Sequence, residues 1–135
     1  MADNRAIITE TFDALAKGDG RPFVKLMADD FVWIMEGKTA WSGTYSGKAE
    51  VQARVLGPLF AQFELPYVNR AEKIIVEGDD VVVLCRGNVN TKTGKRYDNS
   101  YCYVITMRDG AMIKLREYFD TELVTAVLEA PSVAD

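Results

Sequence analysis

The chain has 135 residues, of which 48% are apolar, and this is enough for one domain with a continuous core. Its 16 basic and 20 acidic residues give a net charge of −4 without a block of like charge. Such a surface repels phosphate backbones and anionic lipids, so neither nucleic acid nor a membrane is an expected partner.

The two cysteines, Cys85 and Cys102, are too few for a disulfide framework, and the chain contains no histidine. The N-terminal segment lacks the basic start and apolar stretch of a signal peptide, and no apolar run approaches membrane-spanning length. We therefore expect a cytoplasmic protein without a metal ion or another cofactor. Its chemistry would have to come from carboxylate, Tyr, Lys, Arg or Cys side chains.

Helical spacing of apolar residues dominates the first half of the chain. It predicts a helix over residues 4–17 and a second, short helix over residues 19–30. A β-rich run over residues 31–36 predicts a strand, and the glycine-rich segment 37–47 predicts a loop. Apolar residues at every fourth position predict a longer helix over residues 48–63, kinked at its Gly-Pro pair.

From Tyr67 onward the apolar period is two, with turn signals at residues 77–79, 91–95 and 108–110. This pattern predicts four antiparallel strands joined by hairpins. Residues 121–128 could add a last helical turn or two, and residues 129–135 are expected to fray. Helices followed by a strand meander indicate a single α+β domain over residues 1–135, with helices covering one face of the sheet.

Five stretches in a fixed order carry a family resemblance: residues 14–19, 27–30, 43–49, 97–101 and 116–120. Together they resemble the nuclear transport factor 2-like superfamily, within it the SnoaL-like and ketosteroid-isomerase-like branch. The resemblance implies a cone-shaped α+β barrel. In such a fold, helices pack on a strongly curved, mostly antiparallel sheet that encloses one pocket.

The resemblance also implies which strand faces look into the pocket. Alternate side chains of a strand share a face. Limonene epoxide hydrolase, a relative on this fold, has its catalytic acid in an Arg-Asp-Tyr-Phe-Asp run of the last strand, and the matching residue here is Glu117. The same comparison aligns that family's Arg-x-Asp pair with Arg86 and Asn88. It implies a catalytic pair of Glu117 and Arg86, and a binding set of Trp33, Met35, Asn88, Asn99, Tyr101, Tyr103, Leu115 and Phe119.

Neither relative's named activity carries over to this set of residues. The epoxide hydrolase needs a second carboxylate, which Asn88 does not supply, and the base of ketosteroid isomerase aligns near Met35. The distance from Glu117 to Arg86 would set the protonation state of the carboxyl, because burial raises its pKa and a nearby guanidinium lowers it. Phenols and amides could stabilise a developing oxyanion.

Two functions remain open at this point. The first is a cofactor-independent isomerase, cyclase, hydratase or hydrolase that uses general acid–base chemistry on a small apolar or carbonyl-containing molecule. The second is a non-catalytic ligand-binding or dimeric assembly module, in which Glu117 and Arg86 form a structural pair. An open pocket with Glu117 at its base favours the first, and a filled pocket with Glu117 fully paired favours the second.

The other face of the sheet leads to an expectation about assembly. Strand parity groups five apolar residues on the outer side of two neighbouring strands: Val81, Val83, Cys85, Cys102 and Val104. An exposed apolar patch of this kind is uncommon on a monomer, so we expect a homodimer through the outer sheet face. The alternative is that residues 123–128 fold back over the patch.

Overall fold

The computed structural model describes residues 3–131. Its elements in chain order are α1 (Asn4–Leu15), α2 (Arg21–Leu26), β1 (Met27–Met35), β2 (Gly43–Ser46), α3 (Lys48–Val51), the π-helical turn η1 (Gln52–Leu56), α4 (Gly57–Phe60), β3 (Phe63–Glu77), β4 (Asp80–Thr91), β5 (Ser100–Arg108), β6 (Ala111–Phe119) and α5 (Thr121–Val127).

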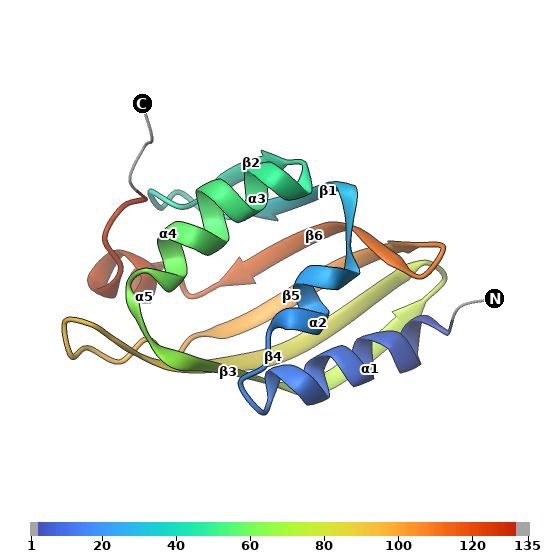
Figure 1. Cartoon of the computed structure of the whole chain (residues 1–135), viewed down its shortest axis with the longest axis horizontal. Helices are drawn as coiled ribbons and strands as arrows, with labels where there is room; N and C mark the ends of the chain where they lie inside the picture. The colour runs from blue at the N-terminus through green and yellow to red at the C-terminus, as the bar shows by residue number, and fades with distance from the viewer. Residues whose placement is uncertain (1–2, 132–135) are drawn as a thin grey trace.

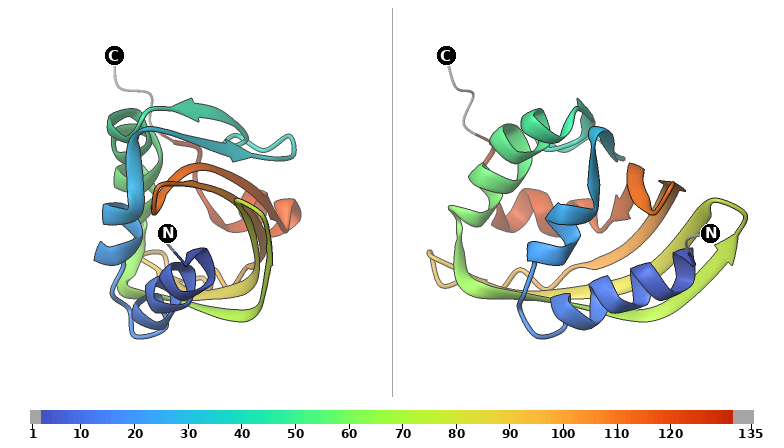
Figure 2. Two further views of the ribbon diagram at one scale, coloured as in Figure 1. Left: turned by 90° about the vertical axis from the view of Figure 1, so that its right-hand side faces the viewer. Right: turned by 45° about the vertical axis from the view of Figure 1, so that its right-hand side comes forward.

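The six strands form one sheet in the order β2-β1-β6-β5-β4-β3. Neighbouring strands are antiparallel except β1 and β6, which are parallel. The sheet is strongly curved, and helices α1, α2 and α3 to α4 lie across its concave side (Figures 1 and 2). The predicted α+β cone is therefore confirmed, with one refinement: the sheet stays open, and β2 and β3 lie at its two edges.

The helix ends follow from short capping contacts. The Asp3 side chain accepts a hydrogen bond from the Ala6 amide at 3.2 Å, which satisfies one of the free donors at the start of α1. The Asp120 side chain does the same for Leu123 at the start of α5, also at 3.2 Å. Helix α5 continues the chain directly from the end of β6.

Three segments differ from the sequence-based expectation. Strand β1 begins at Met27 rather than near residue 31, and the expected loop 37–47 contains the short strand β2. The expected kinked helix over residues 48–63 instead contains the π-helical turn η1, which precedes Gly57 and Pro58. Pro58 therefore lies in the first turn of α4, where a missing N–H is tolerated.

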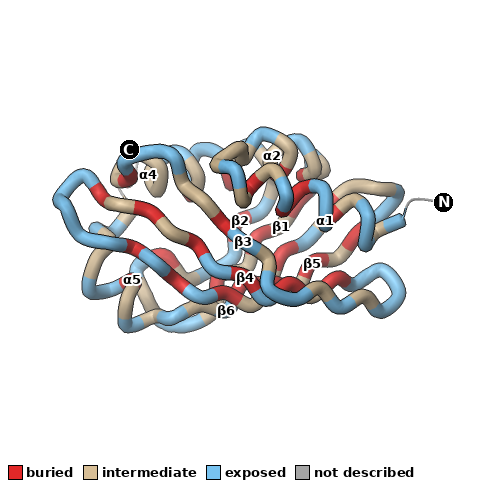
Figure 3. The backbone as a smooth tube through the Cα atoms, turned by 90° about the horizontal axis from the view of Figure 1, so that it is seen from below, coloured by how far each residue is buried: buried red, intermediate tan, exposed pale blue. Residues whose placement is uncertain are grey.

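Strand β4 presents the opposite face to the one expected. Val81, Val83 and Cys85 point inward and are at most 2% exposed. They lie opposite inward-facing residues of β5, with Val83 paired to Tyr103. Buried and exposed residues alternate along these strands (Figure 3). The predicted five-residue outer patch is therefore wrong, because three of its members belong to the core.

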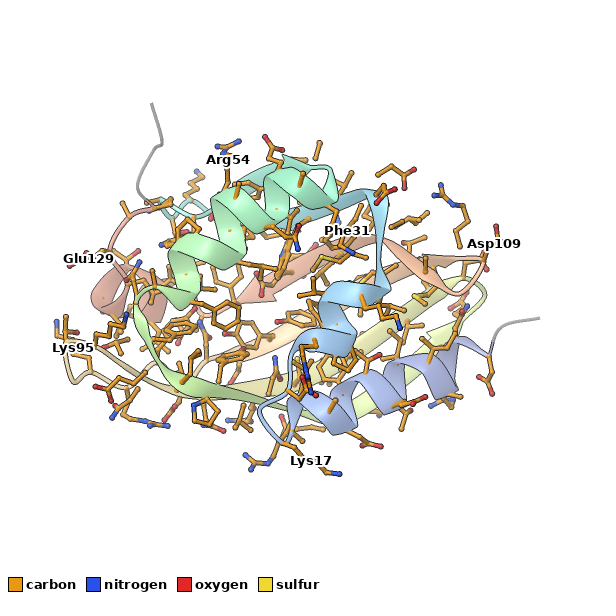
Figure 4. The ribbon with its side chains drawn as sticks, viewed as in Figure 1. Lys17, Phe31, Arg54, Lys95, Asp109 and Glu129 are labelled. Carbon is orange, nitrogen blue, oxygen red and sulfur yellow. The ribbon has the colours of Figure 1, made fainter. Side chains whose placement is uncertain are left out.

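The end of the described chain is held in place at Glu129. Its carbonyl oxygen accepts hydrogen bonds from Trp41 Nε1 at 3.0 Å and from Gln62 Nε2 at 3.1 Å. The predicted frayed tail over residues 129–135 thus begins at a residue that is hydrogen-bonded to the rest of the fold, and residues 132–135 lie outside the described residues. Figure 4 shows Glu129 beside α5, and Arg54 pointing outward from the helical layer.

Among residues 3–131, no helix is long and apolar enough to cross a membrane.

Candidate functional site

A cavity of about 880 Å³ lies between the helices and the concave face of the sheet. Its helical side is largely apolar and includes Leu15, Phe23, Leu56, Leu59 and Phe60. Its sheet side is lined by Trp33, Met35, Phe63, Tyr67, Asn69, Tyr97, Tyr101, Tyr103, Glu117 and Phe119. The cations that border it are Arg21, Lys25 and Lys48, none of which is buried. The chain's own side chains therefore leave room for a ligand of drug-like size.

Glu117 is the acidic residue of this cavity. It is 6% exposed and lies opposite Met35 of β1 on one side and Tyr103 of β5 on the other. Among residues 3–131, no basic side chain lies within ion-pair distance of its carboxylate. Burial away from water raises the pKa of Glu117 from 4.5 to about 8, so at neutral pH the carboxyl carries its proton.

Two donors lie beside this carboxyl and work against the effect of burial. The Trp33 indole and the Tyr103 hydroxyl each lower the pKa of Glu117 as donors close to it, by less than burial raises it. Trp33 Nε1 lies near the carboxyl but makes no hydrogen bond of ordinary geometry to it or to any other group in the described part of the chain. A buried N–H is thus left available beside a protonated carboxyl.

Four tyrosines continue the polar lining away from Glu117. Burial raises the pKa of Tyr97 to about 12 and that of Tyr67, Tyr101 and Tyr103 further still, so all four hydroxyls stay protonated at neutral pH. The hydroxyl of Tyr67 lies 3.4 Å from that of Tyr101 and accepts a hydrogen bond from Asn69 Nδ2 at 3.2 Å. The tyrosine-lined part of the cavity therefore offers neutral hydrogen-bonding groups, and the cations of the lining, Arg21, Lys25 and Lys48, come from its helical side.

Arg86 and Asn88 do not belong to this site. Arg86 is exposed on the outer face of the sheet, where its Nε donates to a Glu72 carboxylate oxygen at 3.0 Å. Asn88 shares that face and lies close to Asp98. The reason is the pairing of β4 with β5. Arg86 lies opposite Ser100, which faces outward, and paired residues of neighbouring strands lie on the same face of the sheet. The expected pair of Glu117 and Arg86 is therefore corrected, and Glu117 stands without a guanidinium.

Asn99 and Leu115 lie inside the fold but away from the cavity lining. Asn99 is 1% exposed, and its amide bridges the Tyr97 hydroxyl, at 3.0 Å, and the backbone of Asp120, at 3.1 and 3.2 Å. Its oxygen also accepts from the Ser100 amide at 2.8 Å, so the side chain of Asn99 is engaged by Tyr97, Ser100 and Asp120. Leu115 is fully buried in the core.

The remaining members of the predicted set line the cavity with Glu117: Trp33, Met35, Tyr101, Tyr103 and Phe119.

Sequence reasoning missed Tyr67, Asn69 and Trp41 as lining residues. Gly87 carried a usable signal, because glycine inside a strand often marks a close approach by another group. A Cβ atom at Gly87 would lie 2.5 Å from the Tyr67 hydroxyl, so the missing side chain makes room for that phenol. Nothing comparable in the sequence pointed to Trp41, which lies in the turn before β2.

Comparison with known proteins agrees with this architecture. The SnoaL-like domain family matches residues 8–115, so the chain belongs to that family, within the nuclear transport factor 2-like superfamily. No curated protein matches the sequence significantly.

Within residues 3–131, no three His, Cys, Asp or Glu side chains gather closely enough to hold a metal ion.

Solved structures share the fold over nearly the whole chain. An NTF2-like protein of unknown function from Burkholderia pseudomallei is 20% identical, with a TM-score of 0.78 over 96% of this chain and 100% of the other. A protein from Jannaschia sp. CCS1 described as a SnoaL-like polyketide cyclase is 22% identical, with a TM-score of 0.74 over 96% and 93%. A Bacillus subtilis protein described as an isomerase is 20% identical, with a TM-score of 0.74 over 91% and 90%.

Proposed function

We propose that the chain is a cofactor-independent enzyme that performs general acid–base chemistry on a small, mostly apolar, carbonyl-containing molecule bound in the cavity. The observation that carries the proposal is the carboxyl of Glu117, buried in an open cavity without a cationic partner among residues 3–131. Burial raises its pKa to about 8, close to the pH at which such an enzyme would work.

In this scheme Glu117 acts first as a general acid. Its carboxyl donates the proton to the carbonyl oxygen of the substrate as the carbonyl π electrons move onto that oxygen. The resulting carboxylate then removes a proton from the carbon next to the carbonyl, whose C–H electrons form the C=C bond of the enol, and this returns Glu117 to its protonated state. The Trp33 N–H and the Tyr103 hydroxyl stabilise the intermediate carboxylate, because both lower the pKa of Glu117.

Two features support an enzyme over a binding module without chemistry. Arg86 pairs with Glu72 on the outer face, so it does not neutralise Glu117 as a structural partner. Two of the structural neighbours are also described as enzymes, one as a polyketide cyclase and one as an isomerase. Isomerase and cyclase chemistry on carbonyl compounds both require proton transfer of the kind proposed here.

The test uses a neutral bicyclic ketone, 2-tetralone, whose α-protons exchange with solvent through the enol. Exchange in D₂O is followed by NMR with wild-type protein and with Glu117→Gln, which keeps the volume but removes the titratable group. We expect the wild type to accelerate exchange and Glu117→Gln to lose on the order of 10²-fold of that rate. Equal rates for the two proteins would remove Glu117 from the mechanism.

A further inference from the structure

Asn69 carries a buried acceptor that the fold does not satisfy. The residue is 1% exposed and borders the cavity from β3. Its Nδ2 donates to the Tyr67 hydroxyl at 3.2 Å, and in this amide orientation Oδ1 has no hydrogen-bond partner in the described chain. The Cys85 thiol also lies close to the amide, but a thiol is a weak donor. A buried acceptor left unpaired costs about 1–3 kcal/mol, a cost that a ligand hydroxyl would relieve.

The surroundings of Asn69 define the chemistry of its missing partner. The Tyr67 hydroxyl is already engaged with Asn69 Nδ2 and lies 3.4 Å from the Tyr101 hydroxyl. Burial raises the pKa of both phenols, so they stay neutral, and the hydrogen bonds of this cluster join only uncharged side chains in the described part of the chain. A neutral hydroxyl group that donates to Asn69 Oδ1 fits this cluster. An anionic group has no proton to donate and would be repelled by the partial negative charge of this oxygen.

The Glu117 end of the same cavity has the opposite polarity. At neutral pH the protonated Glu117 carboxyl and the unpaired Trp33 N–H are both donors, and they suit a carbonyl oxygen. Glu117 lies on β6 and Asn69 on β3, three strands apart in the sheet order. Three strand spacings place their backbones about 14 Å apart along the sheet, before curvature brings the side chains closer together.

We propose that the cavity binds a neutral, ring-containing molecule with two polar ends: a carbonyl oxygen at Glu117 and a hydroxyl group that donates to Asn69 Oδ1. The carbonyl end rests on the proposed function. The hydroxyl end rests on Asn69 alone and makes this residue a specificity determinant. The apolar remainder of the lining packs against the rings.

Binding of three matched probes tests the hydroxyl end. Flavanone carries a carbonyl on a ring system, 4′-hydroxyflavanone adds a distant hydroxyl, and 4′-methoxyflavanone blocks that donor while keeping the oxygen. Dissociation constants are measured by isothermal titration calorimetry at neutral pH. We expect the hydroxyl compound to bind about tenfold more tightly than flavanone, and the methoxy compound no more tightly than flavanone. Equal affinities for the three probes, or no binding of any of them, overturn the proposal.

Two variants separate this proposal from the proposed catalysis. Asn69→Leu replaces the amide by an apolar group of similar size, so it should abolish the preference for the hydroxyl while flavanone still binds. Glu117→Gln should keep the preference, whatever it does to proton exchange. A preference that survives in Asn69→Leu contradicts the assignment. If Asn69→Leu does not fold, the ranking of the three probes with wild-type protein decides by itself.

Discussion

Glu117 of β6 and Tyr103 of β5 lie directly opposite each other across the strand pair, and both are buried on the cavity side. The phenol lowers the pKa of the carboxyl, and the carboxyl in turn contributes to the raised pKa of the phenol. Burial still dominates for Glu117, because among the described residues no cation faces it. The exclusion of water from the cavity wall therefore keeps the Glu117 carboxyl protonated at neutral pH.

The stability of the fold should depend on pH through Glu117. Its pKa is about 8 in the folded chain and 4.5 ordinarily, so between these pH values the folded state holds a proton that the unfolded state has lost. The free energy of unfolding then falls as pH rises, by at most about 1.4 kcal/mol per pH unit. Few other groups titrate in this window, because the chain has no histidine.

Urea unfolding between pH 5 and pH 8 measures this dependence. Wild-type protein should lose stability steadily over the range, whereas Glu117→Gln should show a much flatter profile. Parallel profiles for the two proteins would mean that Glu117 ionises at its ordinary pH in the folded state.

Gly87→Ala should destabilise the fold by about 1–3 kcal/mol. The added methyl group would lie 2.5 Å from the Tyr67 hydroxyl and 3.0 Å from two of its ring atoms. Tyr67→Phe removes the closest of these atoms, so the two substitutions together should cost less than the sum of their separate effects. The coupling is measured by denaturant unfolding of both single variants and the double variant. Simple additivity would show that the phenol does not occupy the space above Gly87.

The two tryptophans should respond differently to replacement by phenylalanine. Trp33 Nε1 has no partner in the described chain, whereas Trp41 Nε1 donates to the Glu129 carbonyl at 3.0 Å. Both substitutions reduce ring size, but Trp41→Phe also breaks a hydrogen bond, so it should lower the free energy of unfolding by about 1 kcal/mol more. Thermal unfolding of the two variants makes the comparison. A larger loss for Trp33→Phe would indicate that its N–H is bonded in the free protein.

We propose that two copies pair through the outer sheet face, now with corrected residues. Leu84, Cys102 and Tyr118 lie opposite one another on β4, β5 and β6, and Leu84 and Tyr118 are 38% and 48% exposed. Arg86 and Glu72 carry both signs of charge on this sheet, which suits a self-complementary contact. Sedimentation should show a dimer that Leu84→Lys with Tyr118→Lys dissociates. Leu65→Lys, at the cavity, should leave the mass unchanged, and a wild-type monomer at micromolar concentration would refute the proposal.

The sequence predicted the order of the elements apart from β2. Alternation separated the two faces of β5 and β6, and the family resemblance correctly implied which face looks inward. It misassigned β4, although its pattern held the answer: Val81, Val83 and Cys85 form an all-apolar set, and the other set contains Arg86. The resemblance to the epoxide hydrolase aligned Arg86 and Asn88 with an inward-facing pair of that family, and the prediction followed this alignment instead of the apolar pattern. The short strand β2 gave too few residues for a periodic signal, and bulges in β3 between Glu64 and Val68 hid the inward side of Tyr67.

The most direct test of the account is the ionisation of Glu117 itself. Carbon-detected NMR of the side-chain carboxyl, assigned by its absence in Glu117→Gln, follows the titration from pH 4 to pH 10. Tyr103→Phe should raise the midpoint further, whereas Tyr118→Phe on the outer face should leave it unchanged. The account predicts a wild-type pKa of about 8. A midpoint near the ordinary value of 4.5 would contradict the claim that the cavity holds a protonated acid at neutral pH.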